Sequence, residues 1–313
     1  MDRKTPLIVI TGPTGSGKTA AALKLAEKHP LEVISADSMQ VYRHMDIATA
    51  KPSTEELSIL PHHLIDVVDP DEEFNAGMFV TLARQKIREV RSRGAIPLVV
   101  GGTGLYIKAL IYGLAPAPPR SDRVRAHLRA VADRKGSPHL WRLLSRLDPK
   151  TTRNLGENDR VRIIRALEIM ILTGRRPSDF YQEHGFSRPF CEARIVCIVP
   201  RRQRLYENIN SRVVRMVEMG LIDETKSLLA LGYSPSLRSM QTLAYKHIVD
   251  FLESKIGLDL AISLIQRDTR RYAKRQLTWM RSHYDPGSFL SPEEALPVLE
   301  SMLRAEFPDR SGI

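Results

Sequence analysis

A chain of 313 residues, 42% of them hydrophobic, is long enough for about two domains and a sizeable core. It has no apolar run near the roughly 20 residues that a membrane helix needs, which excludes a helical membrane protein. The net charge is +11, and residues 1–119 are neutral, residues 120–194 carry +8 and residues 195–313 carry +3. An excess concentrated in one segment favours a polyanionic partner, most simply nucleic acid, over a merely solvated basic face.

The first third of the chain alternates between strand and helix patterns. Alternating strands and helices predict βαβ units and a parallel sheet with ligands at the carboxyl ends of its strands. The expected strands are residues 6–10, 31–37, 62–69 and 95–102, and the expected helices are residues 18–29 and 75–94.

A proline-rich linker at residues 113–122 interrupts this pattern. Residues 120–190 are rich in Arg and Leu and look helical, and residues 193–200 return to strand composition. We therefore expect an α/β core of residues 1–119 and 195–313 with a basic helical insertion of residues 120–194. A long helix is expected at residues 258–282.

The two cysteines, Cys191 and Cys197, do not form a C-x-x-C pair, and the nine histidines show no metal-ligand spacing with them. The adjacent His62 and His63 are read as surface or strand-end residues. The chain begins without the pattern of a signal peptide. These features predict reduced thiols, no membrane association and a cytoplasmic protein.

A phosphate-binding loop lies between the first strand and the first helix. The pattern G-x-x-x-x-G-K-T supplies glycines whose backbone N–H groups wrap an anion at a helix N-terminus. The lysine is expected to reach the terminal phosphates and the threonine hydroxyl to hold Mg²⁺. The motif comprises Gly12, Pro13, Thr14, Gly15, Ser16, Gly17, Lys18 and Thr19.

Two side chains follow strands toward the same edge of the sheet. Asp37 ends the second strand, where it serves equally as a general base or metal ligand, or as a turn residue. Thr103 follows Gly101-Gly102, either in the cleft or in a tight strand-to-helix turn. Asp66 and Asp69 are weaker candidates for an acid of Walker-B type, and no better one is present.

The run "RRYAKRQLTWMR" has basic residues at near-helical spacing, with aromatic residues between them. Arg271, Lys274 and Arg275 could line a channel for a polyanion. Equally, the aromatic residues could belong to the core and the arginines to a solvated face.

Seven stretches together resemble tRNA dimethylallyltransferases of the bacterial type, also called tRNA isopentenyltransferases. They run in family order from residue 12 to residue 281. Ala48 and Ala244 stand where the family pattern usually has glycine. The stretches are "GPTGSGKT", "ISADSMQVYRHMDIATAKP", "PHHLIDVVDPDEEFNAGMF", "PLVVGGTGLYIKALIYG", "NDRVRIIRALEI", "SMQTLAYK" and "AKRQLTWMR".

The resemblance implies a P-loop NTPase-like core that binds dimethylallyl diphosphate and Mg²⁺ rather than ATP. It implies transfer of the dimethylallyl group to the exocyclic amine of the adenosine 3′ of the anticodon in tRNA. Asp37 would be the general base, with Lys18, Thr19 and Thr103 in the catalytic set, and the enzyme is expected to be a monomer. The implied contacts with the tRNA anticodon stem-loop are Asp37, Ser38, Met39, Gln40, Thr103, Arg125, Val161, Arg162, Ile163, Ile164, Arg165, Gln241, Thr242, Leu243, Ala244, Tyr245 and Lys246, to which the basic helix adds Arg271, Lys274 and Arg275.

Other functions share part of this pattern. A P-loop small-molecule or nucleotide kinase would have the same loop and a nearby aspartate, but it leaves the basic insertion without a role. An RNA-binding switch ATPase should show a Walker-B acid. A transferase acting on free adenine nucleotides would not need the insertion.

Overall fold

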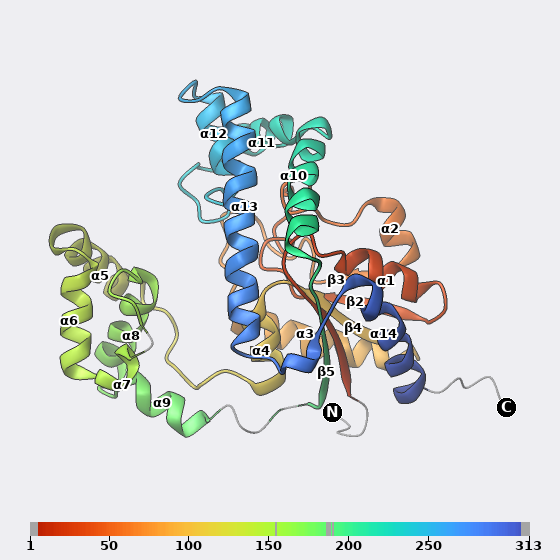
Figure 1. Ribbon diagram of the computed structural model, residues 1–313. Helices are drawn as coiled ribbons and strands as arrows, with labels where there is room; N and C mark the ends of the chain where they lie inside the picture. Colours follow the sequence, from red (N-terminus) through yellow and green to blue (C-terminus); the bar gives the residue numbers. More distant parts are fainter. Residues whose placement is uncertain (1–5, 154, 186–188, 190, 308–313) are drawn as a thin grey trace. The chain divides into compact units, whose positions relative to one another are not determined.

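The computed structural model describes residues 6–153, 155–185, 189 and 191–307 (Figure 1). The chain divides into two compact units, one of Met1–Ile111 with Phe190–Ile313 and the other of Tyr112–Pro189. The expected insertion of residues 120–194 differs from the second unit at both ends. Residues 193 and 194 belong to the first unit because they pair with strand β1 in its sheet.

The first unit is built on a six-stranded sheet of order β3-β2-β4-β1-β5-β6, and every neighbouring pair is parallel. Parallel strands place their carboxyl ends at one edge, so the loops after β1, β2 and β4 meet there. The strands are β1 (Leu7–Thr11), β2 (Leu31–Ser35), β3 (His62–His63), β4 (Ile96–Gly101), β5 (Ala193–Ile198) and β6 (Phe289–Leu290).

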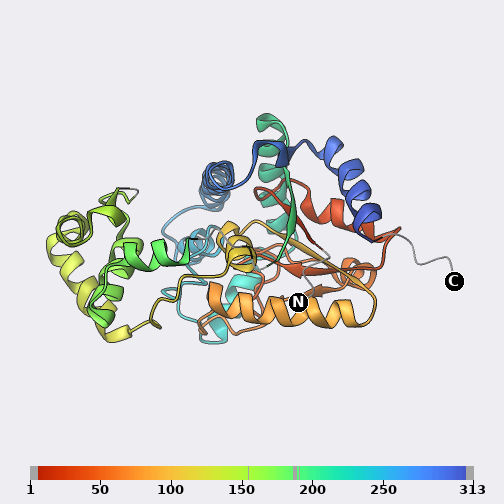
Figure 2. The ribbon, with the colours of Figure 1, turned by 90° about the horizontal axis from the view of Figure 1, so that it is seen from below.

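Helices cover both faces of this sheet, as Figure 2 shows from below. Helices α1 (Lys18–Ala26) and α14 (Pro292–Glu306) pack on one face, and α3 (Ala76–Ser92) packs on the other. Burial on both faces explains why the central strands are continuous apolar runs. Helix α4 (Gly104–Tyr112) follows β4 and joins α3 through the stacked rings of Tyr106 and Phe79, 4.5 Å apart.

Four further helices of this unit pack against one another, and two of them reach the phosphate loop. Figure 1 shows α10 and α13 rising beside the sheet. These helices are α10 (Arg202–Glu218), α11 (Leu221–Ala230), α12 (Tyr245–Leu252) and α13 (Leu258–Arg281). The short helix α2 (Thr54–Ile59) begins with a capping box between Ser53 and Glu56, and a 3₁₀ turn (Pro286–Ser288) precedes β6.

The strand expected at residues 62–69 is wrong beyond its first two residues. Only His62 and His63 pair with β2. Leu64 and Asp66 have positive φ angles of 66° and 54°, a conformation that ends the strand. The backbone of Val67 and Val68 instead donates to the carbonyl of Val41, in the loop after β2.

The second unit contains five helices and no strand among its described residues, and residues 113–121 lead into its first helix without regular structure. Its core joins Leu128, Leu140, Leu144, Ile163 and Leu167. The helices are α5 (Asp122–Lys135), α6 (Ser137–Leu147), α7 (Pro149–Thr152), α8 (Arg160–Thr173) and α9 (Pro177–His184).

A buried acid fastens α5 to α8 inside this unit. Glu168 is fully buried, and its carboxylate accepts two hydrogen bonds from the Arg125 guanidinium, at 2.9 and 3.0 Å. Arg165 Nη1 and the backbone N–H of Ser121 donate to the same carboxylate, at 2.6 and 2.7 Å. Burial opposes the charge of Glu168, but these donors hold its pKa below its usual value.

Candidate active site

The phosphate loop adopts a conformation that only glycine tolerates at three places. Gly12, Gly15 and Gly17 have φ angles of 147°, 79° and 91°. A Cβ on Gly12 would lie 2.4 Å from the carbonyl oxygen of Ile198, so this glycine also permits close contact with β5. The loop then opens directly into α1, whose first residue is Lys18.

Lys18 follows the phosphate loop directly, and its side chain forms hydrogen bonds back to the loop backbone. Its Nζ donates to the carbonyl oxygens of Gly12 and Pro13, at 3.0 and 2.9 Å. Burial lowers the pKa of Lys18 to about 8; the negative charge of Asp37 opposes this shift and the positive charge of Arg212 adds to it. Lys18, Asp37 and Arg212 therefore form one electrostatically coupled group.

A small cavity, partly open to solvent, brings the end of β2 to the phosphate loop. Lys18, Thr19 and Asp37 line it, so three of the four predicted catalytic residues meet in one place, while Thr103 is not among the lining residues. His62 also lines the cavity, and burial lowers its pKa and favours the neutral imidazole. From the sequence, His62 is predicted only as a surface or strand-end residue, because nothing near it in the chain indicates the cavity.

Asp37 and Thr103 come from neighbouring strand ends that are hydrogen-bonded to each other. The Thr103 hydroxyl oxygen accepts from the Ser38 N–H at 3.0 Å, and the Thr103 N–H donates to the Ala36 carbonyl at 3.1 Å. Asp37 Oδ1 accepts from the Met39 N–H at 2.8 Å, which forms an Asx turn. Asp37 is therefore a turn residue that also lies in the site, so its two predicted roles do not exclude each other.

Gln276 on α13 joins the phosphate loop to the end of β4. Its Oε1 accepts from the Thr14 N–H at 2.9 Å, and its Nε2 donates to the Gly102 carbonyl at 3.0 Å. A Cβ on Gly102 would lie 2.5 Å from this Nε2, and one on Gly101 would lie 2.2 Å from the Ala36 carbonyl oxygen. The Gly-Gly pair is thus required for close packing.

Arg212 on α10 supplies a second cation beside the loop. Its Nη1 donates to the Thr14 hydroxyl at 3.3 Å, while Asn208 on the same helix donates to the Gly15 carbonyl at 3.1 Å. Burial lowers the pKa of Arg212, and Asp37 opposes that shift. Sequence reasoning missed Arg212 and Gln276, since neither lies in a motif whose spacing indicates phosphate binding.

Comparison with known proteins places this chain beside one family. The family model described as IPP transferase matches residues 40–283, and one described as isopentenyl transferase matches residues 5–69. A tRNA dimethylallyltransferase 1 of Syntrophotalea carbinolica is 49% identical over 278 residues, which cover 89% of this chain and 88% of that protein. The chain belongs to the tRNA dimethylallyltransferase family.

Solved structures of the family share the fold. The full-length tRNA isopentenylpyrophosphate transferase of Bacillus halodurans is 38% identical, with a TM-score of 0.68 and 97% coverage of both chains. A eukaryotic dimethylallyltransferase, described in its crystallographic snapshots as acting on tRNA, is 29% identical with a TM-score of 0.75. The match covers 88% of this chain and 70% of that one. The predicted α/β fold is confirmed.

The remaining residues predicted to contact tRNA differ in how far their side chains are exposed to solvent. Ile163 and Ile164 are 0% and 5% exposed and belong to the core of the helical unit, so their side chains do not face RNA. Val161 is 76% exposed, and Arg162 is exposed and pairs with Asp159. Arg125 and Arg165, as described above, bind Glu168.

Residues 241–246 divide in the same way. Gln241 and Lys246 are exposed, Thr242 and Leu243 are half-buried, and Ala244 and Tyr245 are buried. Ala244 has φ −92° and ψ −59°, in the right-handed region, and Ala48 is not among the described residues of positive φ. Alanine therefore introduces no backbone strain where the family usually has glycine.

The basic face of α13 is exposed at Arg271, Lys274 and Arg275. Tyr272, between them, is half-buried, and burial raises its pKa to about 12. The Arg275 guanidinium lies 5.7 Å from the centroid of the Tyr272 ring. The tyrosine packs inward and the cations face solvent, as the reading of a solvated basic face expects, and contact of these cations with a polyanion stays a prediction.

Two kinds of feature are absent from the described residues. No helix among them is both long and apolar enough to cross a bilayer. They also contain no cluster of three or more His, Cys, Asp or Glu side chains suited to a metal ion. Both cysteines are free thiols.

Proposed function

We propose that this protein transfers the dimethylallyl group of dimethylallyl diphosphate to the exocyclic amine of the adenosine 3′ of the anticodon in tRNA. The observation that carries the proposal is the shared cavity of Lys18, Thr19 and Asp37 in a chain of the tRNA dimethylallyltransferase family. A kinase would use the same loop, but the family relationship covers the basic helical unit as well.

The phosphate loop holds the diphosphate. Its N–H groups, Lys18 and Arg212 neutralise the charge that builds on the leaving oxygen as the bond to the allylic carbon breaks. The amine nitrogen forms the new bond to that carbon and passes its proton to the Asp37 carboxylate. The products are N-dimethylallyl adenosine in the tRNA and free diphosphate.

The residues at this site fit Mg²⁺. The Thr19 hydroxyl is a hard oxygen donor that lines the cavity, and few protein ligands are typical for an ion that keeps several waters and binds its substrate's phosphates. When bound, the ion would act as a Lewis acid toward the diphosphate oxygens.

The adenosine enters from the side of Ser38, Met39 and Thr103. Taking the base out of its stack costs a few kcal/mol, which contacts between the RNA and the basic surface offset. Those contacts come from the helical unit, from Gln241 and Lys246, and from the exposed cations of α13. Because the substrate is tRNA, we place the enzyme in the cytoplasm, and we expect it to act as a monomer.

The affinity for dimethylallyl diphosphate should decrease above pH 8. The anion binds the protonated form of Lys18, and this group loses its proton as the pH rises through about 8. The dissociation constant is expected to rise by up to about tenfold per pH unit above that value. Calorimetric titration from pH 7 to pH 9 measures it.

A Lys18→Met variant is the control for this titration. It should bind weakly at every pH, with no inflection near pH 8. An equally steep decrease of affinity in the variant would show that another group titrates.

The function itself is tested by transfer of label. The protein is incubated with labelled dimethylallyl diphosphate, Mg²⁺ and unfractionated tRNA, and digestion of the tRNA should place the label on one adenosine. Lys18→Met should abolish the transfer. Turnover of ATP stimulated by a small hydroxylated metabolite, with no label in RNA, would instead establish a kinase.

A further inference from the structure

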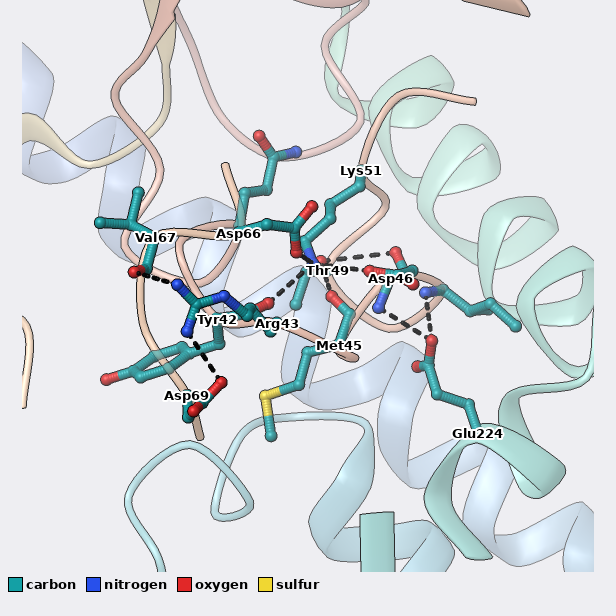
Figure 3. Close-up of polar contacts among 12 residues, drawn as sticks. Tyr42, Arg43, Met45, Asp46, Thr49, Lys51, Asp66, Val67, Asp69 and Glu224 are labelled. Atoms are coloured by element: carbon teal, nitrogen blue, oxygen red, sulfur yellow. Dashed lines mark hydrogen bonds and ion pairs between the residues drawn. The ribbon is translucent and has the colours of Figure 1, made fainter. Parts of the chain in front are cut away.

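The loop of residues 38–51, which follows Asp37, has an anchor far away in the sequence. Figure 3 shows Glu224, on α11, pointing at the backbone of this loop. Its Oε2 accepts from the N–H groups of Asp46 and Ile47, at 2.8 and 2.7 Å. Its Oε1 accepts from the Ala48 N–H at 3.2 Å and from the Tyr245 hydroxyl at 2.6 Å.

Lys51 holds the same loop from its other end. Its ammonium donates to the Tyr42 carbonyl at 2.7 Å and to the carboxylates of Asp46 and Asp66, at 2.6 and 2.5 Å. The Lys51 side chain is only 5% exposed, although its partners Asp46 and Asp66 are 62% and 48% exposed (Figure 3). Asp46 therefore lies between two anchors, Glu224 at its backbone and Lys51 at its side chain.

The loop needs such anchors because its backbone is strained. His44 and Ala50 have φ angles of 63° and 48°, in the left-handed region that residues with a Cβ adopt at a cost. Strained residues persist where the surrounding structure over-determines them, and they gather at functional sites.

The anchored end of the loop reaches the cavity through Gln40. The Gln40 side chain donates to the Ala50 carbonyl at 3.0 Å and accepts from the Ser35 hydroxyl at 2.8 Å. Gln40 lines the cavity of Lys18 and Asp37, whereas Glu224 does not. With both ends of its amide engaged, Gln40 contributes a fixed wall to the cavity.

We infer that Glu224 is a positioning residue for the adenosine. By holding the amides of residues 46–48, it keeps Ala50, Gln40 and hence the Ser38–Met39 stretch in the geometry that receives the base, without touching substrate. This inference rests on the proposed function, and it predicts that placement of the RNA base depends on an acid of α11. The diphosphate end depends instead on α1, α10 and α13.

The test compares Glu224→Gln with Asp223→Asn. The amide retains the shape of Glu224 but replaces one acceptor oxygen with a donor, which faces other donors. Asp223 is the adjacent acid on the same helix, its side chain is 78% exposed, and it pairs only with Lys226 among the described residues. Its replacement should change nothing that is measured.

Hydrogen exchange by mass spectrometry reads the loop directly. In Glu224→Gln, exchange of the amides of residues 46–48 should accelerate about tenfold or more, as expected when a hydrogen bond to a charged group is lost. Exchange at the phosphate loop should stay unchanged. Lys51→Met should accelerate exchange over the same loop.

Kinetics separates positioning from a general loss of structure. Glu224→Gln should lower kcat/KM for tRNA by about tenfold to a hundredfold, while the dissociation constant for dimethylallyl diphosphate stays within about twofold. Equal losses for both substrates would overturn the inference, and so would unchanged exchange or accelerated exchange with normal kcat/KM for tRNA. If the wild-type protein transferred no label, the proposed function would fail, and the exchange data alone would decide whether Glu224 anchors the loop.

Discussion

Asp37→Asn is expected to reduce kcat for transfer by about 10²–10⁴-fold, because an amide cannot accept the proton that leaves the adenosine amine. The fold of the site should survive, since the asparagine Oδ1 can still accept the Met39 N–H that now bonds Asp37 Oδ1 at 2.8 Å. The affinity for tRNA should stay within a few-fold. Single-turnover rates and tRNA binding measured on the same preparation give both quantities.

This experiment should be done at pH 7, because the Asp37→Asn substitution also changes the pKa of Lys18. The negative charge of Asp37 opposes the lowering of the Lys18 pKa, so its removal should move that pKa below about 8. At higher pH the variant would also lose affinity for dimethylallyl diphosphate. The measured rate would then combine this loss with the loss of the base. A variant that keeps more than about a tenth of wild-type kcat at pH 7 would show that Asp37 is not the base.

Replacing both Arg125 and Arg165 with Gln should destabilise the helical unit by about 3–5 kcal/mol, because the fully buried carboxylate of Glu168 would lose its cationic partners. Both arginines belong to the resemblance-based set of tRNA contacts. In this double variant, a loss of tRNA binding would therefore report unfolding. Hydrogen exchange over α5 and α8 measures the destabilisation, and unchanged exchange there would contradict it.

Arg123 and Arg134 are the better probes of RNA binding in this unit. Both are exposed residues of α5, and their spacing of 11 residues places them on one face of the helix. If each contacts a phosphate, replacing both with Gln should reduce the slope of log affinity for tRNA against log salt by about 1.4–1.8. Stability and diphosphate affinity should not change, so an unaltered slope would remove this face from the proposed RNA surface.

Features with a local cause could be predicted from the sequence. The phosphate loop is set by glycines at positive φ between a strand and a helix, and all of its residues are consecutive. The parallel sheet followed from apolar runs alternating with helix patterns, since those runs must be buried on both faces. The helical character and the charge of the second unit could also be predicted, although it begins eight residues and ends five residues before the expected bounds.

Family resemblance identified most of the candidate site but not its side-chain environment. Ile163, Ile164 and Tyr245 lie in stretches that carry the resemblance, yet all three side chains are buried. A consecutive stretch on a helix turns its residues through every direction, so a motif includes both surface and core positions.

Contacts between residues far apart in the chain were decided only by the tertiary structure. Gln276 and Arg212 reach the phosphate loop from 262 and 198 residues away, and Glu224 reaches the 38–51 loop from 176 to 178 residues away. No local pattern marks them, because a glutamine, an arginine or a glutamate on an amphipathic helix is ordinary until its partner is known. The sequence by itself determined the central strands, the helices beside them and the motif that binds phosphate, but not the length of β3. The packing of α10, α11 and α13 against the strand ends decided which polar groups complete the site, since buried donors and acceptors must find partners wherever the fold brings them.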